Sequence, residues 1–141
     1  MNVIPYEPRH LDEMTMQPSQ RYLRDFVTPE AAAAVAGFPA YTATHGDDIL
    51  GCGGVVPVWS GRGVAWSFIS SKAGPHFVAI TRAVRKFLDA QPQDRIETTV
   101  DIDFADGHRW ARMLGFRLEA GRMHKYRPDG GTCSLYARVR A

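Results

Sequence analysis

Residues 70–77, which read SSKAGPHF, combine side chains that are suited to binding an anion. They separate an apolar, aromatic run from an amphipathic run, so they are predicted to join a strand to a helix. The first turn of a helix has free backbone N–H groups and the positive end of the helix dipole, which together favour a phosphate group. Hydroxyl groups, a positive charge and a residue without a Cβ lie in the same stretch: Ser70, Ser71, Lys72 and Gly74, with His76 in the first turn. The junction is therefore a candidate pyrophosphate site.

The same residues have a purely structural explanation. Proline is common at the first position of a helix, so Gly74 and Pro75 are also what a plain helix start requires. Pro75 lacks an N–H donor, and His76 adds bulk at the place where a ligand would approach. Both interpretations stay open from the sequence.

The apolar periodicity predicts the elements that position this junction. Strands are expected at 2–7, 40–46, 49–59, 64–70, 95–103, 116–128 and 132–140, and helices at 8–14, 28–37, 75–90 and 108–114. Thr28 is the expected N-cap of the second helix. Gly51, Gly53 and Gly54 predict a bulge or a close backbone approach in the third strand.

The strand at 64–70, the helix at 75–90 and the strand at 95–103 form a strand–helix–strand unit. Its two strands are expected to be parallel neighbours joined by a right-handed crossover. The last two strands form a hairpin. The predicted fold class is α+β, with a mixed sheet of six or seven strands in a single domain over residues 1–141. Seven side chains are expected to pack on this sheet: Phe77, Ile80, Val84, Phe87, Trp110, Leu114 and Phe116.

Composition narrows the classes of protein that are compatible with the chain. A length of 141 residues with 45% apolar residues suits one core, and no run is long enough to span a membrane, so we expect a protein of the cytoplasm. Cys52 and Cys133 are predicted to be buried free thiols. The five histidines lack metal-ligand spacing, so no metal site is expected.

Charge is unevenly distributed along the chain. Residues 105–141 have seven Arg and one Lys against three acidic residues, whereas residues 1–60 have three Arg against seven acidic residues. A basic region suits an anionic partner, either a phosphorylated cofactor or nucleic acid, and it is also typical of a solvated arginine-rich surface. Nucleic acid is the less favoured partner, because no recognised binding module accompanies the charge.

The chain ends in a helix, the residues LGF at 114–116 and a hairpin, and this order of elements resembles the GNAT superfamily of acyl-CoA N-acyltransferases over nearly its whole length. In that family the glycine is a tight helix exit and the aromatic residue packs beneath the last hairpin. The residues in those places here are Gly115 and Phe116. The length and the ending FRLEAGRMHKYRPDGGTCSLYARVR are most similar to short GNAT-like internal virion proteins of podophages and related prophage proteins.

The resemblance implies acetyl-CoA as cofactor and an amine as acceptor. The residues it implies for cofactor binding, including the strand end that would bind the oxyanion, are Phe68, Ile69, Ser70, Ser71, Lys72, Gly74, His76 and Arg109. Glu97, Asp101 and Asp103 are candidate general bases, any of which could act through a water, and Tyr126 is a candidate acid. Acidic side chains alternating along a strand, as these three do, are also typical of a solvated face.

The chain departs from the family's pattern at two places in the last helix. Ala111 stands where the family commonly has a tyrosine acid, and the asparagine that often starts the last helix is missing. We expect Asp106 to cap that helix instead.

Two functions are therefore predicted. One is acetyl transfer from acetyl-CoA to an amine; the other is a GNAT-fold scaffold without turnover that binds phage structural proteins, in the virion or during its assembly. A homodimer is compatible with either function.

Overall fold

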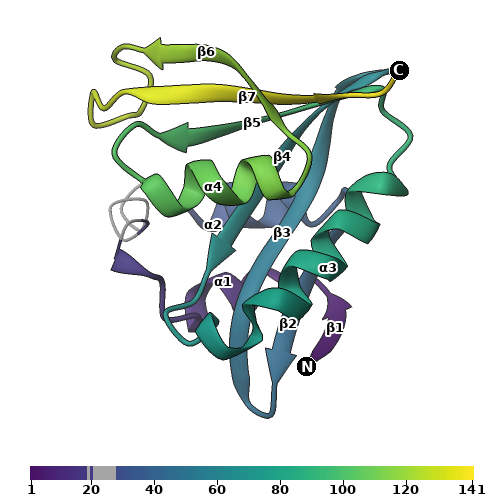
Figure 1. Ribbon diagram of the computed structural model, residues 1–141. Coiled ribbons are helices and arrows are strands. Elements are labelled where there is room, and N and C mark those ends of the chain that lie inside the picture. Colours follow the sequence, from purple (N-terminus) through teal and green to yellow (C-terminus); the bar gives the residue numbers. More distant parts are fainter. Residues whose placement is uncertain (19, 21–27) are drawn as a thin grey trace. The chain divides into compact units, whose positions relative to one another are not determined.

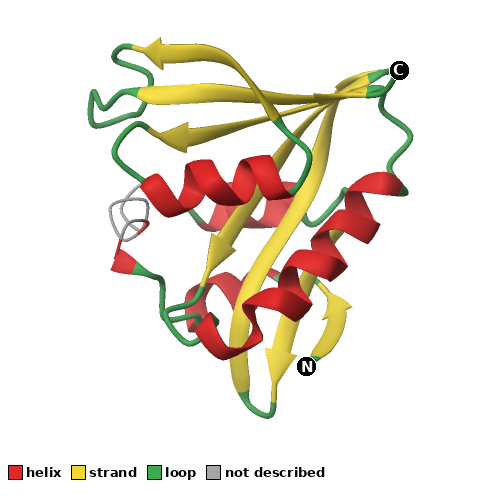
Figure 2. Cartoon of the chain, in the orientation of Figure 1, coloured by secondary structure: helices red, strands yellow, loops and turns green. Residues whose placement is uncertain are grey.

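The computed structural model describes residues 1–18, 20 and 28–141. Their order is β1 (Asn2–Pro5), α1 (Pro8–Glu13), α2 (Pro29–Val35), β2 (Ala40–His45), β3 (Asp48–Trp59), β4 (Arg62–Ile69), a 3-10 turn η2 (Gly74–His76), α3 (Phe77–Asp89), β5 (Arg95–Asp101), α4 (Ala105–Met113), β6 (Arg117–Met123) and β7 (Cys133–Val139). Figures 1 and 2 show these helices and strands. Part of the stretch 15–27, to which the sequence assigned no element, lies outside the described residues.

The described strands form one mixed sheet in the order β1-β2-β3-β4-β5-β7-β6. β4 and β5 are parallel, as predicted, but their register covers only Arg62–Val64 against Arg95–Glu97. β7 lies between β5 and β6 and is antiparallel to both. The α+β class, the seven strands and the closing hairpin are confirmed.

Contacts divide the chain into two compact units, and the division falls within β3, β4 and α3. The first unit consists of residues 1–56 and 65–82, and the second consists of residues 57–64 and 83–141. Each unit is described by itself below.

The core of the first unit is made by the inner side of α1 and the segments that pack on it. Tyr6, Leu11, Met14, Met16, Ala32 and Cys52 are buried there. The Tyr6 hydroxyl donates to the carbonyl of Ala32 at 3.1 Å, which ties the end of β1 to α2. Thr28 caps α2 as expected, because its Oγ1 accepts the N–H of Ala31 at 3.1 Å.

His10 is almost fully buried at the start of the first unit, with 1% of its surface exposed. Its Nδ1 accepts the backbone N–H of Glu7 at 3.1 Å and lies 2.8 Å from Oγ1 of Thr42, which in turn lies 3.6 Å from Sγ of Cys52. A nitrogen that accepts a backbone N–H carries no proton, so His10 is neutral and protonated on Nε2. Burial, and secondarily the charge of Arg9, lowers the pKa of His10.

The glycines of β3 permit the close backbone approach that the sequence predicted. A Cβ at Gly54 would lie 2.4 Å from the carbonyl oxygen of Pro39, and one at Gly53 would lie 2.9 Å from that of Trp66. A shift of the β2–β3 register between Ala43 and Thr44 is the expected irregularity. Side chains at these glycines would push β3 away from its neighbours.

In the second unit α4 packs against β5 (Figure 1), and His108 of α4 contacts Tyr136 of β7. A Cβ at Gly107 would lie 2.8 Å from Cγ1 of Val100, so the glycine allows the helix to approach the sheet. Gly115 ends the helix with φ +92°, a left-handed conformation that side chains disfavour. Phe116 is 4% exposed directly after it, which confirms its predicted place in the core.

Three predictions about helix ends and packing need correction. α4 begins at Ala105 with Phe104 as its N-cap, so Asp106 lies in the first turn and pairs with Arg109 rather than capping the helix. α3 begins at Phe77, because Gly74–His76 forms a 3-10 turn that keeps Pro75 out of the regular helix. Of the seven side chains expected to pack on the sheet, Ile80, Leu114 and Phe116 are buried, and Phe77, Val84, Phe87 and Trp110 are half-buried.

Both cysteines are free and buried, as the sequence predicted. Cys52 lies in β3 and Cys133 begins β7. Burial raises the pKa of Cys52 to about 11 and also raises that of Cys133. Neither thiol is activated as a nucleophile.

Replacing Phe116 by Ala is expected to lower the free energy of unfolding by about 3–5 kcal/mol, because a buried ring is lost and a cavity remains. Denaturant unfolding followed by tryptophan fluorescence measures the change. Leu118→Ala is the control, since Leu118 is 49% exposed and its loss should cost about 0.5 kcal/mol or less. Equal effects of the two variants would contradict the assignment of Phe116 to the core.

Stability is expected to fall as the pH is lowered from 7.5 to 5.5, because His10 is folded as a neutral side chain. Its pKa is lowered from 6.5 in the folded state, so the unfolded chain binds the proton first. The contribution is complete above pH 6.5 and is lost as the pH falls below it. Thermal midpoints of the wild type and of His10→Gln test this, since the variant should depend less on pH in this range.

A thiol reagent is expected to react slowly with the native protein, because both thiols are buried and their pKa values are raised. In denaturant two thiols per chain should react at once. Fewer than two would show that a cysteine is bonded and would overturn the free-thiol assignment.

Candidate functional site

The β4–α3 loop, residues 70–77, has most of its backbone N–H groups in use within the first unit. They donate from Ser71 to the Thr15 carbonyl (2.9 Å), from Lys72 to Ser70 Oγ (3.0 Å), from Ala73 to the Ser70 carbonyl (3.1 Å) and from His76 to the Ala73 carbonyl (2.9 Å). Phe77 donates to the carbonyl of Gly74, and Pro75 has no N–H. The loop therefore offers a phosphate fewer backbone donors than its sequence suggested, and side chains become the main source of contacts.

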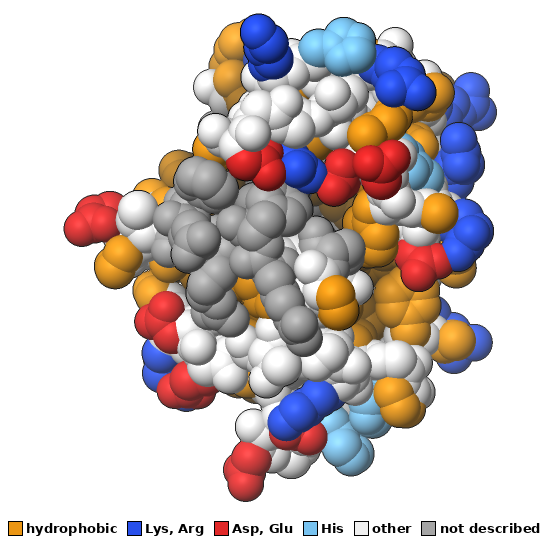
Figure 3. All heavy atoms as spheres, turned by 90° about the vertical axis from the view of Figure 1, so that its left-hand side faces the viewer, with side chains coloured by type: hydrophobic (Ala, Val, Ile, Leu, Met, Phe, Trp, Pro, Cys, Tyr) orange, Lys and Arg blue, Asp and Glu red, His pale blue; other side chains and the backbone are white. Residues whose placement is uncertain are grey.

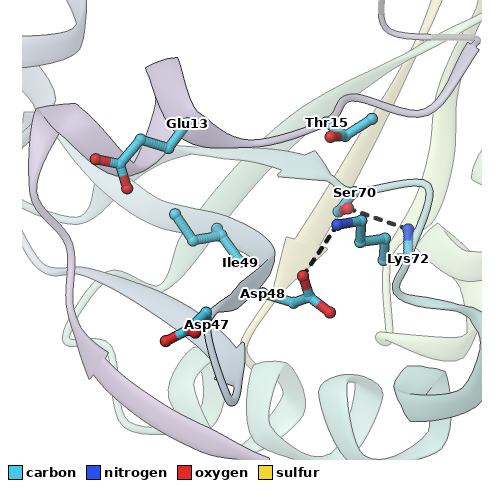
Figure 4. Close-up of a pocket in the computed structure, with 7 residues that line it drawn as sticks. All are labelled: Glu13, Thr15, Asp47, Asp48, Ile49, Ser70 and Lys72. Carbon is cyan, nitrogen blue, oxygen red and sulfur yellow. Dashed lines mark hydrogen bonds and ion pairs between the residues drawn. The ribbon is translucent and has the colours of Figure 1, made fainter.

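Lys72 projects from this loop and is paired with an acid. Its Nζ lies 2.9 Å from Oδ1 of Asp48, and both side chains are about half exposed. The pair borders a small polar pocket, shown in Figure 4, whose lining residues are Glu13, Thr15, Asp47, Asp48, Ile49, Ser70 and Lys72. The positive charge that the sequence assigned to an anion is thus partly balanced by carboxylates.

Two histidine rings contact each other beside the same loop, tilted by 38°. The rings of His45, at the end of β2, and His76, in the 3-10 turn, have centroids 4.5 Å apart. Figure 3 shows histidine, acidic and basic side chains side by side at the lower edge of the face in view. The neighbourhood of the loop is therefore rich in titratable groups of both signs.

The end of β4 carries the three predicted oxyanion donors, and their N–H groups do not share one direction. The N–H of Ser70 donates to the carbonyl of Leu50 at 2.9 Å, so it points to β3. The N–H of Ile69 points to the opposite edge, where it donates to Oε1 of Gln20 at 2.9 Å. The backbone carbonyl of Phe68 lies on the side of β3, 3.1 Å from where a Cβ on Gly51 would be.

Gln20 was not predicted as a site residue, yet it binds β4 twice. Besides accepting from Ile69, its Nε2 donates to the carbonyl of Ser67 at 3.0 Å. A single glutamine far from β4 in the sequence gives no signal of this contact. Only the fold brings it to the strand.

In the second unit Glu97 is buried in an ion pair, contrary to the expectation of a solvated face. Its Oε2 lies 2.6 Å from Nε of Arg62 and its Oε1 lies 3.1 Å from Nη2 of the same guanidinium. Nε of Arg95 lies 3.6 Å from Oε2. Hydrogen bonding to Arg62 lowers the pKa of Glu97, so this carboxylate is a weak proton acceptor.

The other site residues predicted in the second unit lie at its surface. Asp101 pairs with Arg127 at 2.6 Å, and Tyr126 is 54% exposed in the loop after β6. Arg109 is exposed on α4 beside Asp106. None of these residues contacts Glu97 through an interaction that the structure describes.

His108 and Tyr136 form a hydrogen-bonded pair that the sequence analysis did not identify. Nδ1 of His108 lies 2.8 Å from the Tyr136 hydroxyl, and Nε2 lies 3.1 Å from the carbonyl of Ile102. Because the carbonyl only accepts, His108 carries its proton on Nε2 and accepts from Tyr136. Ala111, in the place of the family's tyrosine, is buried on the same helix.

Within the described ranges there is no group of three or more His, Cys, Asp or Glu side chains arranged to bind a metal ion. No helix of the described chain has the length and apolar character needed to cross a bilayer.

Comparison with solved structures identifies the fold. Ard1 from Thermoplasma volcanium superposes with a TM-score of 0.80 at 14% identity, over 99% of this chain and 97% of that one. An acetyltransferase of the GNAT family from Streptococcus pneumoniae gives 0.68 at 12% identity over 99% of each chain. The structure of yncA from Salmonella typhimurium with its cofactor acetyl-CoA gives 0.73 at 9% identity, over 100% of this chain and 94% of that one.

No protein-family model and no curated protein sequence matches the chain. At such low identity the superpositions establish the fold alone. The chain has the fold of GNAT acyl-CoA N-acyltransferases, as the order of elements and the LGF residues predicted.

Proposed function

We propose that the protein is an acyl-CoA-dependent N-acyltransferase that transfers an acetyl group from acetyl-CoA to an amine. The observation that carries the proposal is the structural similarity of nearly the whole chain to solved acetyltransferases, at a TM-score of 0.68 over 99% of each chain for the GNAT-family acetyltransferase from Streptococcus pneumoniae. The structure of yncA, which contains acetyl-CoA, supports the choice of cofactor.

The residues of the β4–α3 loop suit the anionic part of acetyl-CoA through their side chains. Ser71 and Lys72 are exposed there, and His76 is half-exposed. Because the N–H groups of Ser71 and Ala73 already donate to carbonyls, the backbone contributes little to phosphate binding. We therefore assign pyrophosphate binding to Ser71, Lys72 and His76, with Gly74 allowing close approach, and Arg109 stays a further candidate for cofactor binding.

Transfer requires the neutral amine to attack the thioester carbonyl, after which the C–S bond breaks and the thiolate takes a proton. Glu97 is unsuited to accept the ammonium proton, because Arg62 binds both of its oxygens. Asp101, which is partly exposed beside Arg127, and the exposed Asp103 are the remaining candidate bases, directly or through water. The exposed hydroxyl of Tyr126 is the candidate acid for the thiolate.

One observation favours the second function, a scaffold without turnover. Most N–H groups of the loop already have partners, and Ala111 stands where the family commonly has a tyrosine, so both cofactor binding and protonation of the thiolate would be weaker than in the family. A role in a phage particle, where the partners are structural proteins, rests on the sequence resemblance to podophage virion proteins. Absence of acetyl-CoA binding would favour this function.

Isothermal titration of the purified protein with acetyl-CoA tests the proposal. Lys72→Glu is expected to weaken binding at least tenfold, because a charge-assisted contact is worth about 1.5–3 kcal/mol and a repulsion replaces it. Asp48→Asn is the matched variant: it frees Lys72 from its partner at 2.9 Å and should strengthen binding. Unchanged binding by both variants would place the phosphate groups away from this loop.

A further inference from the structure

The outer edge of β4 is covered by the segment that follows α1. The parallel pairing of β4 with β5 ends at Val64. Further along, Met16 pairs with Ser70 in an isolated antiparallel bridge, flanked by hydrogen bonds from Gln17 N–H to the Ile69 carbonyl (3.0 Å) and from Ser71 N–H to the Thr15 carbonyl (2.9 Å). Residues 15–17 and the side chain of Gln20 therefore supply partners that a strand edge otherwise lacks.

The backbone contact that Met16 makes with β4 and the side-chain contact that Gln20 makes with it differ in how firmly they are held. Met16 is buried in the core of the first unit, at 3% exposure, and anchors the antiparallel bridge. Gln20 binds β4 by its carboxamide alone, with neutral hydrogen bonds to Ser67 and Ile69. Bonds of this kind contribute little net free energy when water or a ligand can replace them.

The carboxamide of Gln20 takes the place of one residue of a neighbouring strand on β4. It donates to the carbonyl of Ser67 and accepts the N–H of Ile69, two residues further on. A residue of a parallel neighbouring strand would offer the same pair of atoms to the same two positions. Nε2 of Gln17 donates to Oε1 of Gln20 at 3.0 Å and orients the amide in this place.

These two positions lie next to the loop that we assign to the pyrophosphate. Ile69 ends β4, and Ser71 and Lys72 follow at once. The arm of an acyl-CoA carries secondary amides between the thioester and the pyrophosphate. An arm running along β4 towards the loop would present the N–H of one of its amides to the Ser67 carbonyl and the C=O of the other to the Ile69 N–H.

We propose that Gln20 is an internal competitor for the amide arm of the acyl-CoA, holding the Ser67 and Ile69 positions of β4 until the arm displaces its carboxamide. The inference rests on the proposed function, because it takes the ligand to be an acyl-CoA. Binding then includes the release of Gln20, which lowers the apparent affinity by the fraction of molecules in which β4 is open.

The first test compares acetyl-CoA binding by the wild type, Gln20→Ala and Gln20→Met in isothermal titration. Both variants lose the donor to the Ser67 carbonyl and the acceptor for the Ile69 N–H, and the second keeps about the size of the side chain. The dissociation constant is expected to fall about tenfold in each, whereas Gln17→Ala, which leaves the contacts of Gln20 with β4 in place, should change it much less. Acetyl-pantetheine, which has the amides without the nucleotide, should show the same ratio between wild type and variants.

The second test uses the wild-type protein, so it does not depend on the folding of a variant. On saturation with acetyl-CoA, the side-chain amide NMR signals of Gln20 should move to solvent-exposed values, while the Ile69 amide stays protected from hydrogen exchange. Signals of Gln20 that stay unchanged in the bound state would overturn the inference.

The outcomes separate the two proposals. Acetyl-CoA binding that is equal or weaker in the Gln20 variants overturns the role of Gln20 as a competitor and leaves the acyltransferase proposal standing. Absence of binding by the wild type and by both Gln20 variants overturns both proposals.

Discussion

The structure depends on how the backbone of β4 is satisfied along its outer edge. A buried N–H or C=O without a partner costs about 1–3 kcal/mol, so a strand that leaves its neighbour must find other partners. β4 pairs with β5 only as far as Val64. Beyond this point Thr15–Gln17 and the side chain of Gln20 serve the same edge.

This constraint links the architecture to the proposed chemistry. The positions that must be satisfied, Ser67 and Ile69, lie in the strand that leads into the β4–α3 loop. The side-chain amide of Gln20 satisfies them, and most N–H groups of the loop have partners within the first unit. Under the proposal, a ligand on β4 would replace existing hydrogen bonds rather than fill vacant positions.

The buried carboxylate of Glu97 also requires partners. Glu97 is buried, and Arg62 binds both of its oxygens while Arg95 approaches from the side. Removing Arg62 would leave the buried carboxylate of Glu97 without its main partner, so this ion pair helps to hold the beginning of β4 to β5. A carboxylate held in this way supports the sheet and is a poor base.

The sequence by itself determined the elements, the parallel β4–β5 pair, the tight exit at Gly115, the buried Phe116 and the free thiols. These features follow from local patterns: apolar periodicity, capping at Thr28 and the need for glycine at positive φ. The resemblance carried by LGF and the order of elements led to the fold that the superpositions bear out.

The tertiary structure alone decided the partners of the polar groups. Nothing in the alternation of Glu97 with its neighbours reveals that Arg62, 35 residues earlier, binds it, and a strand pattern predicts a water-facing carboxylate equally well. The contacts of Gln20 with β4, of Lys72 with Asp48 and of His108 with Tyr136 have the same origin. A side chain's type states which bonds it can make, but the partner it meets depends on long-range folding, which local pattern does not encode.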